Sequence, residues 1–318
     1  MHDRSMAIAI LCSHLCEGEG CLPLEPKEYS ALAERLAGKE LHPEDLLTFG
    51  AQDYRQLLEL TEEQTERLLR LFDRSAALSF EISKYESMGI RLITRADELY
   101  PKKLRKKLKN GCPPLFYVAG ELALLEQNGI GYVGSRSIGT EDVAFEQDAV
   151  RKTTKNGFST VSGGARGCDI VAEETALNEG GTAIAWLSDS MLRKLRDGKT
   201  LRYVQQGKLL LLSVAKPDAG FNTGFAMMRN KYIYAQSEAA VVIKADYNKG
   251  GTWNGAVENL RHHWAIPLCR DHLAYPGNKA LIGQGAIPVD ETWDGTLEAF
   301  RTAPISEEAE QLNFLDTL

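Results

Sequence analysis

The sequence has no apolar run of the roughly 18 residues that a helix needs to cross a bilayer. Its longest apolar stretches, at 209–214 and 239–243, have the length of strands. Residues 1–16 place an acid and a base before a short apolar stretch and lack a clear small-residue cleavage site. We interpret this segment as a helix of the mature protein, and we expect no association with a membrane.

Cysteines are few, with six spread over 318 residues. This spacing argues against a disulfide framework and is typical of a reducing compartment, so we predict a cytoplasmic protein. Cys12, His14, Cys16 and Cys21 could ligate a metal. Zinc sites usually hold their ligands as close pairs on two separated knuckles, however, and no second knuckle follows this segment. We interpret the segment as a buried helix and predict neither a metal site nor a cofactor.

An excess of basic residues is also lacking, since the formal net charge is −7. This value excludes a protein coated in positive charge, although a local basic groove can exist on an acidic chain. The hydrophobic and charged fractions, 43% and 25%, are ordinary for a globular protein.

The chain divides into three regions. Residues 1–85 are rich in Leu, Glu, Ala and Arg with helical periodicity, and Thr61-Glu-Glu-Gln forms a capping-box pattern. Residues 86–304 contain short apolar strands, and from residue 129 these alternate with helical stretches. Residues 305–318 form a short acidic tail. We predict a small all-α domain, then an α/β domain with an extended Rossmann-like parallel sheet, then the tail.

Most of the expected elements follow from glycine positions and apolar runs. The pattern predicts helices at 142–156 and 168–178. It predicts strands at 90–93, 131–134, 158–161, 182–187, 209–213, 239–244 and 265–268. Parallel sheets of this kind bind ligands at the carboxyl ends of their strands.

Two glycine-rich loops follow neighbouring expected strands. The first contains Ser135 and Arg136, and the second contains Ser162, Gly163, Gly164 and Arg166. Glycines at a strand-to-helix turn let the backbone approach a ligand, and the exposed amides at the helix start attract anions. Each arginine adds a planar fork that suits phosphate oxygens. One such loop alone is equally compatible with tight packing, but two favour an anion-binding edge.

Neither loop fits a nucleotide fingerprint. A dinucleotide-binding motif requires a third glycine, and this glycine is missing after Gly134. The chain also has no Walker-type Gly-Lys-Ser/Thr.

Two further segments complete the candidate site. Phe225, Arg229, Asn230 and Lys231 combine an aromatic ring with basic groups, which can stack a base while binding a phosphate. A helix with a buried aromatic stripe is the alternative for Phe225. Gly250, Gly251 and Thr252 lie at another strand-to-helix turn.

These motifs together resemble the core of the DprA/Smf family of DNA-processing proteins. That core reads, in order, Gly-Ser-Arg, Ser-Gly-x-Ala-x-Gly-x-Asp, Phe-x-x-Arg-Asn-Arg-x-Ile, Ser-Gly-Ser-x-x-Thr-Ala, and Pro-Gly before Asn-x-Leu-Ile-x-x-Gly-Ala. This chain has related segments at 134–136, 162–169, 225–233, 250–256 and 278–286. It departs from the family at Lys231, which replaces Arg, at Gly250, which replaces Ser, and at Glu173, where the family often has His.

The resemblance implies a Rossmann-type domain that binds single-stranded DNA and helps to load a RecA-type recombinase during natural transformation. It implies a homodimer, no enzymatic activity, and a main phosphate contact at Arg136. It assigns DNA binding to Ser135, Arg136, Ser162, Gly163, Gly164, Arg166, Phe225, Arg229, Asn230, Lys231, Gly250, Gly251 and Thr252. The sequence ends before the winged-helix domain of many members, so we expect a divergent member that serves DNA uptake or another DNA-directed process such as defence.

Two alternatives remain open. Related lysine-decarboxylase-like nucleotide phosphoribohydrolases carry Gly-Gly-x-Gly-Thr-x-x-Glu with an upstream arginine, and Arg229 and Glu258 would take the catalytic roles here. The second alternative is a Rossmann module that senses a nucleotide without hydrolysing it. Turnover of a nucleotide, abolished by Glu258→Gln, would identify the hydrolase.

Overall fold

The computed structural model describes residues 1–17 and 21–301. The chain forms two compact units, one from Met1–Ala119 with Ser213–Ala219, the other from Gly120–Leu212 with the chain from Gly220 onward. The domain boundaries predicted after residues 85 and 304 remain predictions, and the acidic tail at 305–318 lies outside the described residues. Among the described helices, none combines the length and apolar character that a membrane span requires.

The first unit is mainly helical. Its helices are α1 (Asp3–Cys12), α2 (Pro26–Ala37), η1 (Pro43–Leu47), α3 (Ala51–Gln56), α4 (Glu62–Asp73), α5 (Ser75–Ser87), α6 (Lys102–Leu108) and η2 (Lys109–Gly111). The predicted capping box is confirmed at α4, where Thr61 Oγ1 accepts from Gln64 N (3.2 Å) and Gln64 Oε1 accepts from Thr61 N (3.1 Å). This unit also contains β1 (Arg91–Thr94) and β2 (Leu115–Ala119), which pair antiparallel.

The second unit carries a mostly parallel sheet in the order β6-β5-β4-β3-β7-β8-β9. The strands are β3 (Gly129–Val133), β4 (Ser159–Ser162), β5 (Ala183–Leu187), β6 (Leu209–Ser213), β7 (Ala239–Val242), β8 (Ile266–Arg270) and β9 (Ile287–Val289). The helices are η3 (Leu122–Glu126), α7 (Thr140–Lys155), α8 (Cys168–Asn178), α9 (Met191–Leu195), α10 (Gly198–Gln205), α11 (Thr223–Gln236), α12 (Gly250–His262), α13 (Pro276–Gly283) and α14 (Glu298–Arg301). The predicted α/β class is confirmed.

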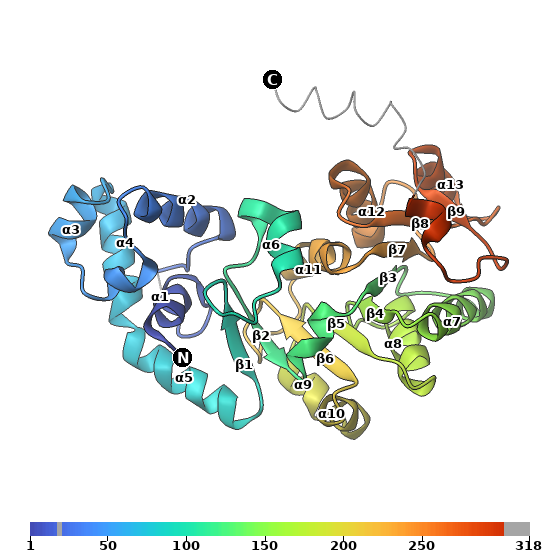
Figure 1. Ribbon diagram of the computed structural model, residues 1–318, viewed down its shortest axis with the longest axis horizontal. Helices are drawn as coiled ribbons and strands as arrows, with labels where there is room; N and C mark the ends of the chain where they lie inside the picture. Colours follow the sequence, from blue (N-terminus) through green and yellow to red (C-terminus); the bar gives the residue numbers. More distant parts are fainter. Residues whose placement is uncertain (18–20, 302–318) are drawn as a thin grey trace. The chain divides into compact units, whose positions relative to one another are not determined.

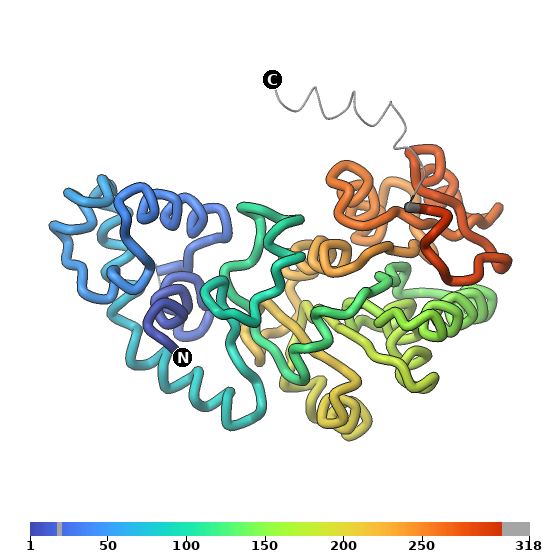
Figure 2. The backbone as a smooth tube through the Cα atoms, viewed as in Figure 1, coloured from blue at the N-terminus to red at the C-terminus, as the bar shows by residue number. Residues whose placement is uncertain are grey.

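The order of strands reverses between β3 and β7. From β3 the chain proceeds outward through α7, β4, α8 and β5 to β6, and then α11 returns it to β7 on the other side of β3 (Figure 2). As a result α7 and α8 cover one face of the sheet, and α11 and α12 cover the other (Figure 1). A reversal of this kind leaves a crevice at the carboxyl ends of the central strands.

The central strands of the sheet are buried along their whole length. All five residues of β3 and of β5 are buried, because helices cover both faces. Ile130 and Tyr132 belong to a cluster that also contains Phe145 of α7 and Leu268 of β8. This packing holds the ends of β3, β4 and β7 in place beneath the loops that follow them.

Candidate nucleic-acid interface

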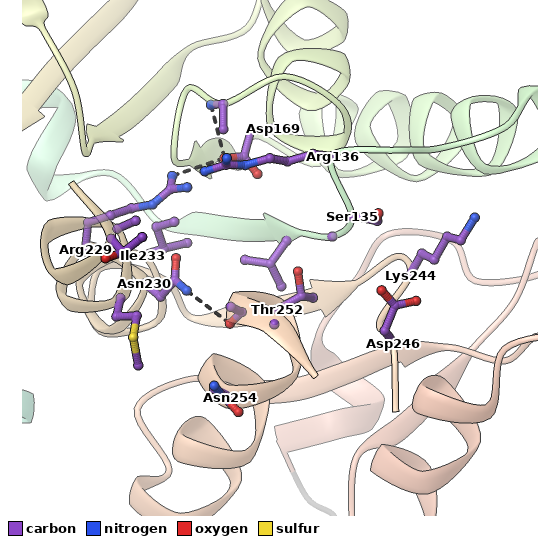
Figure 3. Close-up of a pocket in the computed structure, with 18 of the residues that line it drawn as sticks. Ser135, Arg136, Asp169, Arg229, Asn230, Ile233, Lys244, Asp246, Thr252 and Asn254 are labelled. Carbon is purple, nitrogen blue, oxygen red and sulfur yellow. Dashed lines mark hydrogen bonds and ion pairs between the residues drawn. The ribbon is translucent and has the colours of Figure 1, made fainter. Parts of the chain in front are cut away.

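A cavity of about 490 Å³ opens at the reversal point. The loops after β3, β4 and β7 line it, together with one side of α11 and the first turn of α12 (Figure 3). Its volume lies within the range of about 300–1,000 Å³ that is usual for small-molecule pockets. Eight residues predicted from the sequence line it: Ser135, Arg136, Arg166, Arg229, Asn230, Gly250, Gly251 and Thr252.

The backbone of Ser135 joins the three loops. Its N donates to Lys244 O of the loop after β7 (3.0 Å), and its O accepts from Cys168 N at the start of α8 (3.4 Å). Gly167 makes the second contact possible, because its φ is +85° and a Cβ there would lie 2.7 Å from the Arg136 Cα. The contact holds the two arginine-bearing loops against each other, and Arg136 and Arg166 both line the cavity as exposed side chains.

Arg229 and Asp169 form a buried ion pair at the inner wall. Arg229 Nη1 donates to Asp169 Oδ2 (3.1 Å) and lies 3.4 Å from Trp186 O, and Figure 3 shows the arginine of α11 pointing toward the carboxylate. The relative exposure of each of the two residues is 6%. Asp169 Oδ2 also accepts from Ala165 N (3.2 Å). The pair therefore fixes α11 to the loop after β4.

Ser162, Gly163 and Gly164 do not line the cavity. The Ser162 hydroxyl is buried and donates to the Glu173 carboxyl group, whose pKa is raised by burial. Gly164 N lies 3.4 Å from Ser162 Oγ. Ser162 thus contacts α8, Gly163 lies against Arg229 of α11, and Leu187 and Lys194 lie beside Gly164. The predicted role of these three residues in DNA binding remains untested.

The first turn of α12 faces the cavity without a side-chain cap. Lys249 occupies the N-cap position and makes no capping hydrogen bond, so the first amides of the helix lack that partner. Asn230 Nδ2 donates to Gly251 O (3.1 Å) and so connects α11 to this turn (Figure 3). Uncapped amides at a helix start attract anions.

Phe225 and Lys231 also lie outside the cavity lining. Both are half-buried, and Lys231 Nζ lies 5.6 Å from the centre of the Tyr232 ring. Three residues separate Phe225 from Arg229, whereas the family pattern Phe-x-x-Arg has two. The position that matches the family's phenylalanine is therefore Ala226, and Ala226 lines the cavity. One position on a helix is a rotation of about 100°, which accounts for the different place of Phe225.

Sequence reasoning missed Lys244, Lys249 and Phe221, all of which line the cavity. Both lysines flank the loop that follows an expected strand, which is where parallel sheets bind ligands, but their place beside the arginine loops depends on the pairing of β7 with β3. Phe221 lies in an irregular segment before α11, and no local pattern distinguishes it.

The cavity is lined by more positive than negative groups. Its cations are Arg136, Arg166, Arg229, Lys244 and Lys249, and its carboxylates are Asp169 and Asp246. Asp169 binds Arg229, and Lys244 lies 3.3 Å from Asp142. Within residues 1–17 and 21–301, no ion pair joins Arg136, Arg166 or Lys249 to a carboxylate. These three cations can bind an incoming anion without breaking an internal pair.

The alternative catalytic residues do not meet in this cavity. Arg229 lines it, whereas Glu258 lies one helical turn beyond Asn254, the last residue of α12 in the lining. In the part of the chain that the structure describes, no three His, Cys, Asp or Glu side chains are arranged to hold a metal ion.

Comparison with known proteins identifies relatives along most of the chain. A sequence model of DNA recombination-mediator protein A matches residues 91–300. Protein Smf of Escherichia coli (strain K12) is 29% identical over 241 residues, which cover 73% of this chain and 62% of Smf. DNA processing protein DprA of Streptococcus pneumoniae is 29% identical over 231 residues, which cover 70% of this chain and 76% of DprA.

Two solved structures share the fold. The X-ray structure of DNA processing protein A from Streptococcus pneumoniae has a TM-score of 0.63 at 20% identity, over 84% of this chain and 95% of that one. DNA processing protein A from Helicobacter pylori, described for its unique single-stranded DNA binding mode, has a TM-score of 0.52 at 24% identity, over 70% of this chain and 95% of that one. The chain belongs to the DNA recombination-mediator protein A family, the DprA/Smf family that its motifs predicted.

Proposed function

We propose that the second unit binds single-stranded DNA in the cavity between β3, β4 and β7. The observation that carries this proposal is the set of three cations, Arg136, Arg166 and Lys249, that line one cavity without a carboxylate partner in the described part of the chain. Amides of α12 lie beside them. Binding without sequence preference needs such backbone contacts and a surface for stacking. Membership of the family, and the DNA binding described for the Helicobacter pylori protein, support the same ligand.

The site that we propose includes the eight predicted residues that line the cavity, with Lys244 and Lys249 added. Ser162, Gly163, Gly164, Phe225 and Lys231 are proposed to act behind the lining or on the path of the strand outside it. The chain carries out no catalysis in this proposal.

The wider role that we propose is recombination mediation. A homodimer would bind the strand and help a RecA-type recombinase to assemble on it, in DNA uptake or in a related process such as defence. The absence of a disulfide between any two of the described cysteines fits the reducing cytoplasm that we propose as its compartment. Light scattering tests the dimer, and filament assembly on DNA coated with single-strand-binding protein tests the loading.

The binding proposal is tested by titrating the purified protein with labelled single- and double-stranded oligonucleotides at two salt concentrations. We expect tighter binding of the single strand and a loss of about tenfold or more in Arg136→Ala, since a charged hydrogen bond to phosphate contributes about 1.5–3 kcal/mol. Lys106→Ala on α6 removes one cation from the other unit and should change affinity much less. Equal affinities of wild type and Arg136→Ala would contradict the proposed site.

A further inference from the structure

Phe221 is a half-exposed aromatic side chain in the wall of the cavity. It stands directly before Asn222, whose Oδ1 caps α11 by accepting from Gly224 N (2.7 Å) and Phe225 N (3.3 Å). This cap fixes where the chain enters the helix. A hydrophobic residue before the cap usually packs on the fourth helical residue, but that residue is Ala226, which is too small to cover a phenyl ring. Phe221 keeps 51% of its surface exposed.

The ring of Phe221 contacts the Arg136 guanidinium. The Arg136 Cζ lies 5.0 Å from the ring centre, within the range of a cation–π interaction. Because no described carboxylate pairs with Arg136, the ring holds the guanidinium without neutralising its charge. A phosphate can therefore bind Arg136 while the rest of the ring remains open to the cavity.

The large apolar side chains that are exposed in the described part of the second unit include Leu201, Phe221, Met227, Tyr247 and Leu273. Of these five, Phe221 and Met227 (58% exposed) line this cavity. Phe225, by contrast, lies outside the lining, and Ala226 occupies the position that matches the family's phenylalanine. The cavity is thus lined by the aromatic ring of Phe221, from the segment before α11, and not by the ring of Phe225 in the first turn of that helix.

We propose that Phe221 stacks an unpaired nucleobase whose own phosphate binds Arg136. The inference rests on the proposed function, and it assigns the base contact to a residue that the sequence motifs did not include. The cavity volume of about 490 Å³ suits one nucleotide. Aromatic side chains stack on every kind of base, so this contact adds affinity without adding sequence preference.

The test compares Phe221→Ala with wild type on two strands of equal length, oligo(dT) and the same strand with abasic sites. The abasic strand keeps every phosphate and lacks the bases. We expect Phe221→Ala to bind oligo(dT) about 5- to 100-fold more weakly, the range of one lost stacking contact, and to bind the abasic strand as wild type does. Phe221→Trp should restore binding of oligo(dT), and Phe221→Leu should not.

Phe80→Ala, which removes an exposed ring (71%) from α5 of the other unit, is the matched control and should leave both affinities unchanged. Equal losses on both strands would show that Phe221 only positions Arg136, and unchanged binding of oligo(dT) would show that the ring has no role. Either outcome overturns the inference while binding by the wild type persists. If the wild type binds no single strand, the proposed function fails first and this inference fails with it.

Discussion

Gly163, which lies in a loop predicted to bind a ligand, shows how a glycine can make room for a side chain. A Cβ at this position would lie 0.8 Å from the Arg229 Nη1 atom, so the guanidinium occupies the space that any other residue would need. The glycine therefore permits the buried pair between Arg229 and Asp169. The motif that predicted close approach of backbone and phosphate also encodes the packing of α11 against this loop.

We expect Gly163→Ala to destabilise the protein by about 3–5 kcal/mol, since displacing Arg229 leaves the Asp169 charge buried and unpaired. Denaturant unfolding would measure the change. Gly198→Ala is the matched control, because nothing lies within 4 Å of a Cβ there and alanine is favoured in a helix. A Gly163→Ala protein as stable as the control would contradict this account.

At the scale of single elements, local pattern predicted much of the second unit. The helix expected at 168–178 and the strand expected at 209–213 coincide with α8 and β6. The helix expected at 142–156 is displaced by one or two residues from α7. Glycine C-caps and apolar runs mark these ends, and such signals depend only on neighbouring residues.

The full set of residues that line the cavity could not be predicted from local sequence patterns alone. The place of β7 beside β3 brings Lys244 and Lys249 to the arginine loops, and strand order follows from packing of the whole sheet. The position of Phe221 depends on where Asn222 caps α11. A shift of one residue along the chain, as between Phe225 and Ala226, changes which side chain faces the cavity.

Glu146 makes the packing of α7 on α8 sensitive to pH. It is fully buried, and burial together with the carboxylates of Asp169 and Asp142 raises its pKa well above the usual range. The folded state therefore favours the neutral acid. As pH rises above about 4.3, the unfolded chain releases this proton before the folded one does, so stability falls until the pKa of the folded state is passed.

Glu146→Gln removes that titration. We expect the difference in unfolding free energy between Glu146→Gln and wild type to grow with pH from about pH 4.5 upward, by at most about 1.4 kcal/mol per pH unit, in favour of the variant. Denaturant unfolding of both proteins at several pH values measures this difference. The contributions of the other titrating groups are the same in both proteins and cancel. A difference that stays constant over this pH range would contradict a neutral Glu146.

For the molecule as a whole, the positive cavity lies on a chain of net charge −7. Phosphates outside the cavity gain little from such a chain, so the charge contacts should be few and local. A protein that wrapped a strand on an extended basic surface would instead release many counterions and lose affinity steeply with salt.

The salt dependence of binding distinguishes these two possibilities. If Arg136, Arg166 and Lys249 each contact one phosphate, the logarithm of the binding constant should fall with the logarithm of salt concentration with a slope of about −2, and Arg136→Ala should reduce it to about −1.4. Fluorescence anisotropy with a short oligonucleotide at several salt concentrations measures both slopes. A wild-type slope beyond about −4 would mean that cations outside the cavity make most of the contacts, and an equal slope in Arg136→Ala would remove this arginine from them.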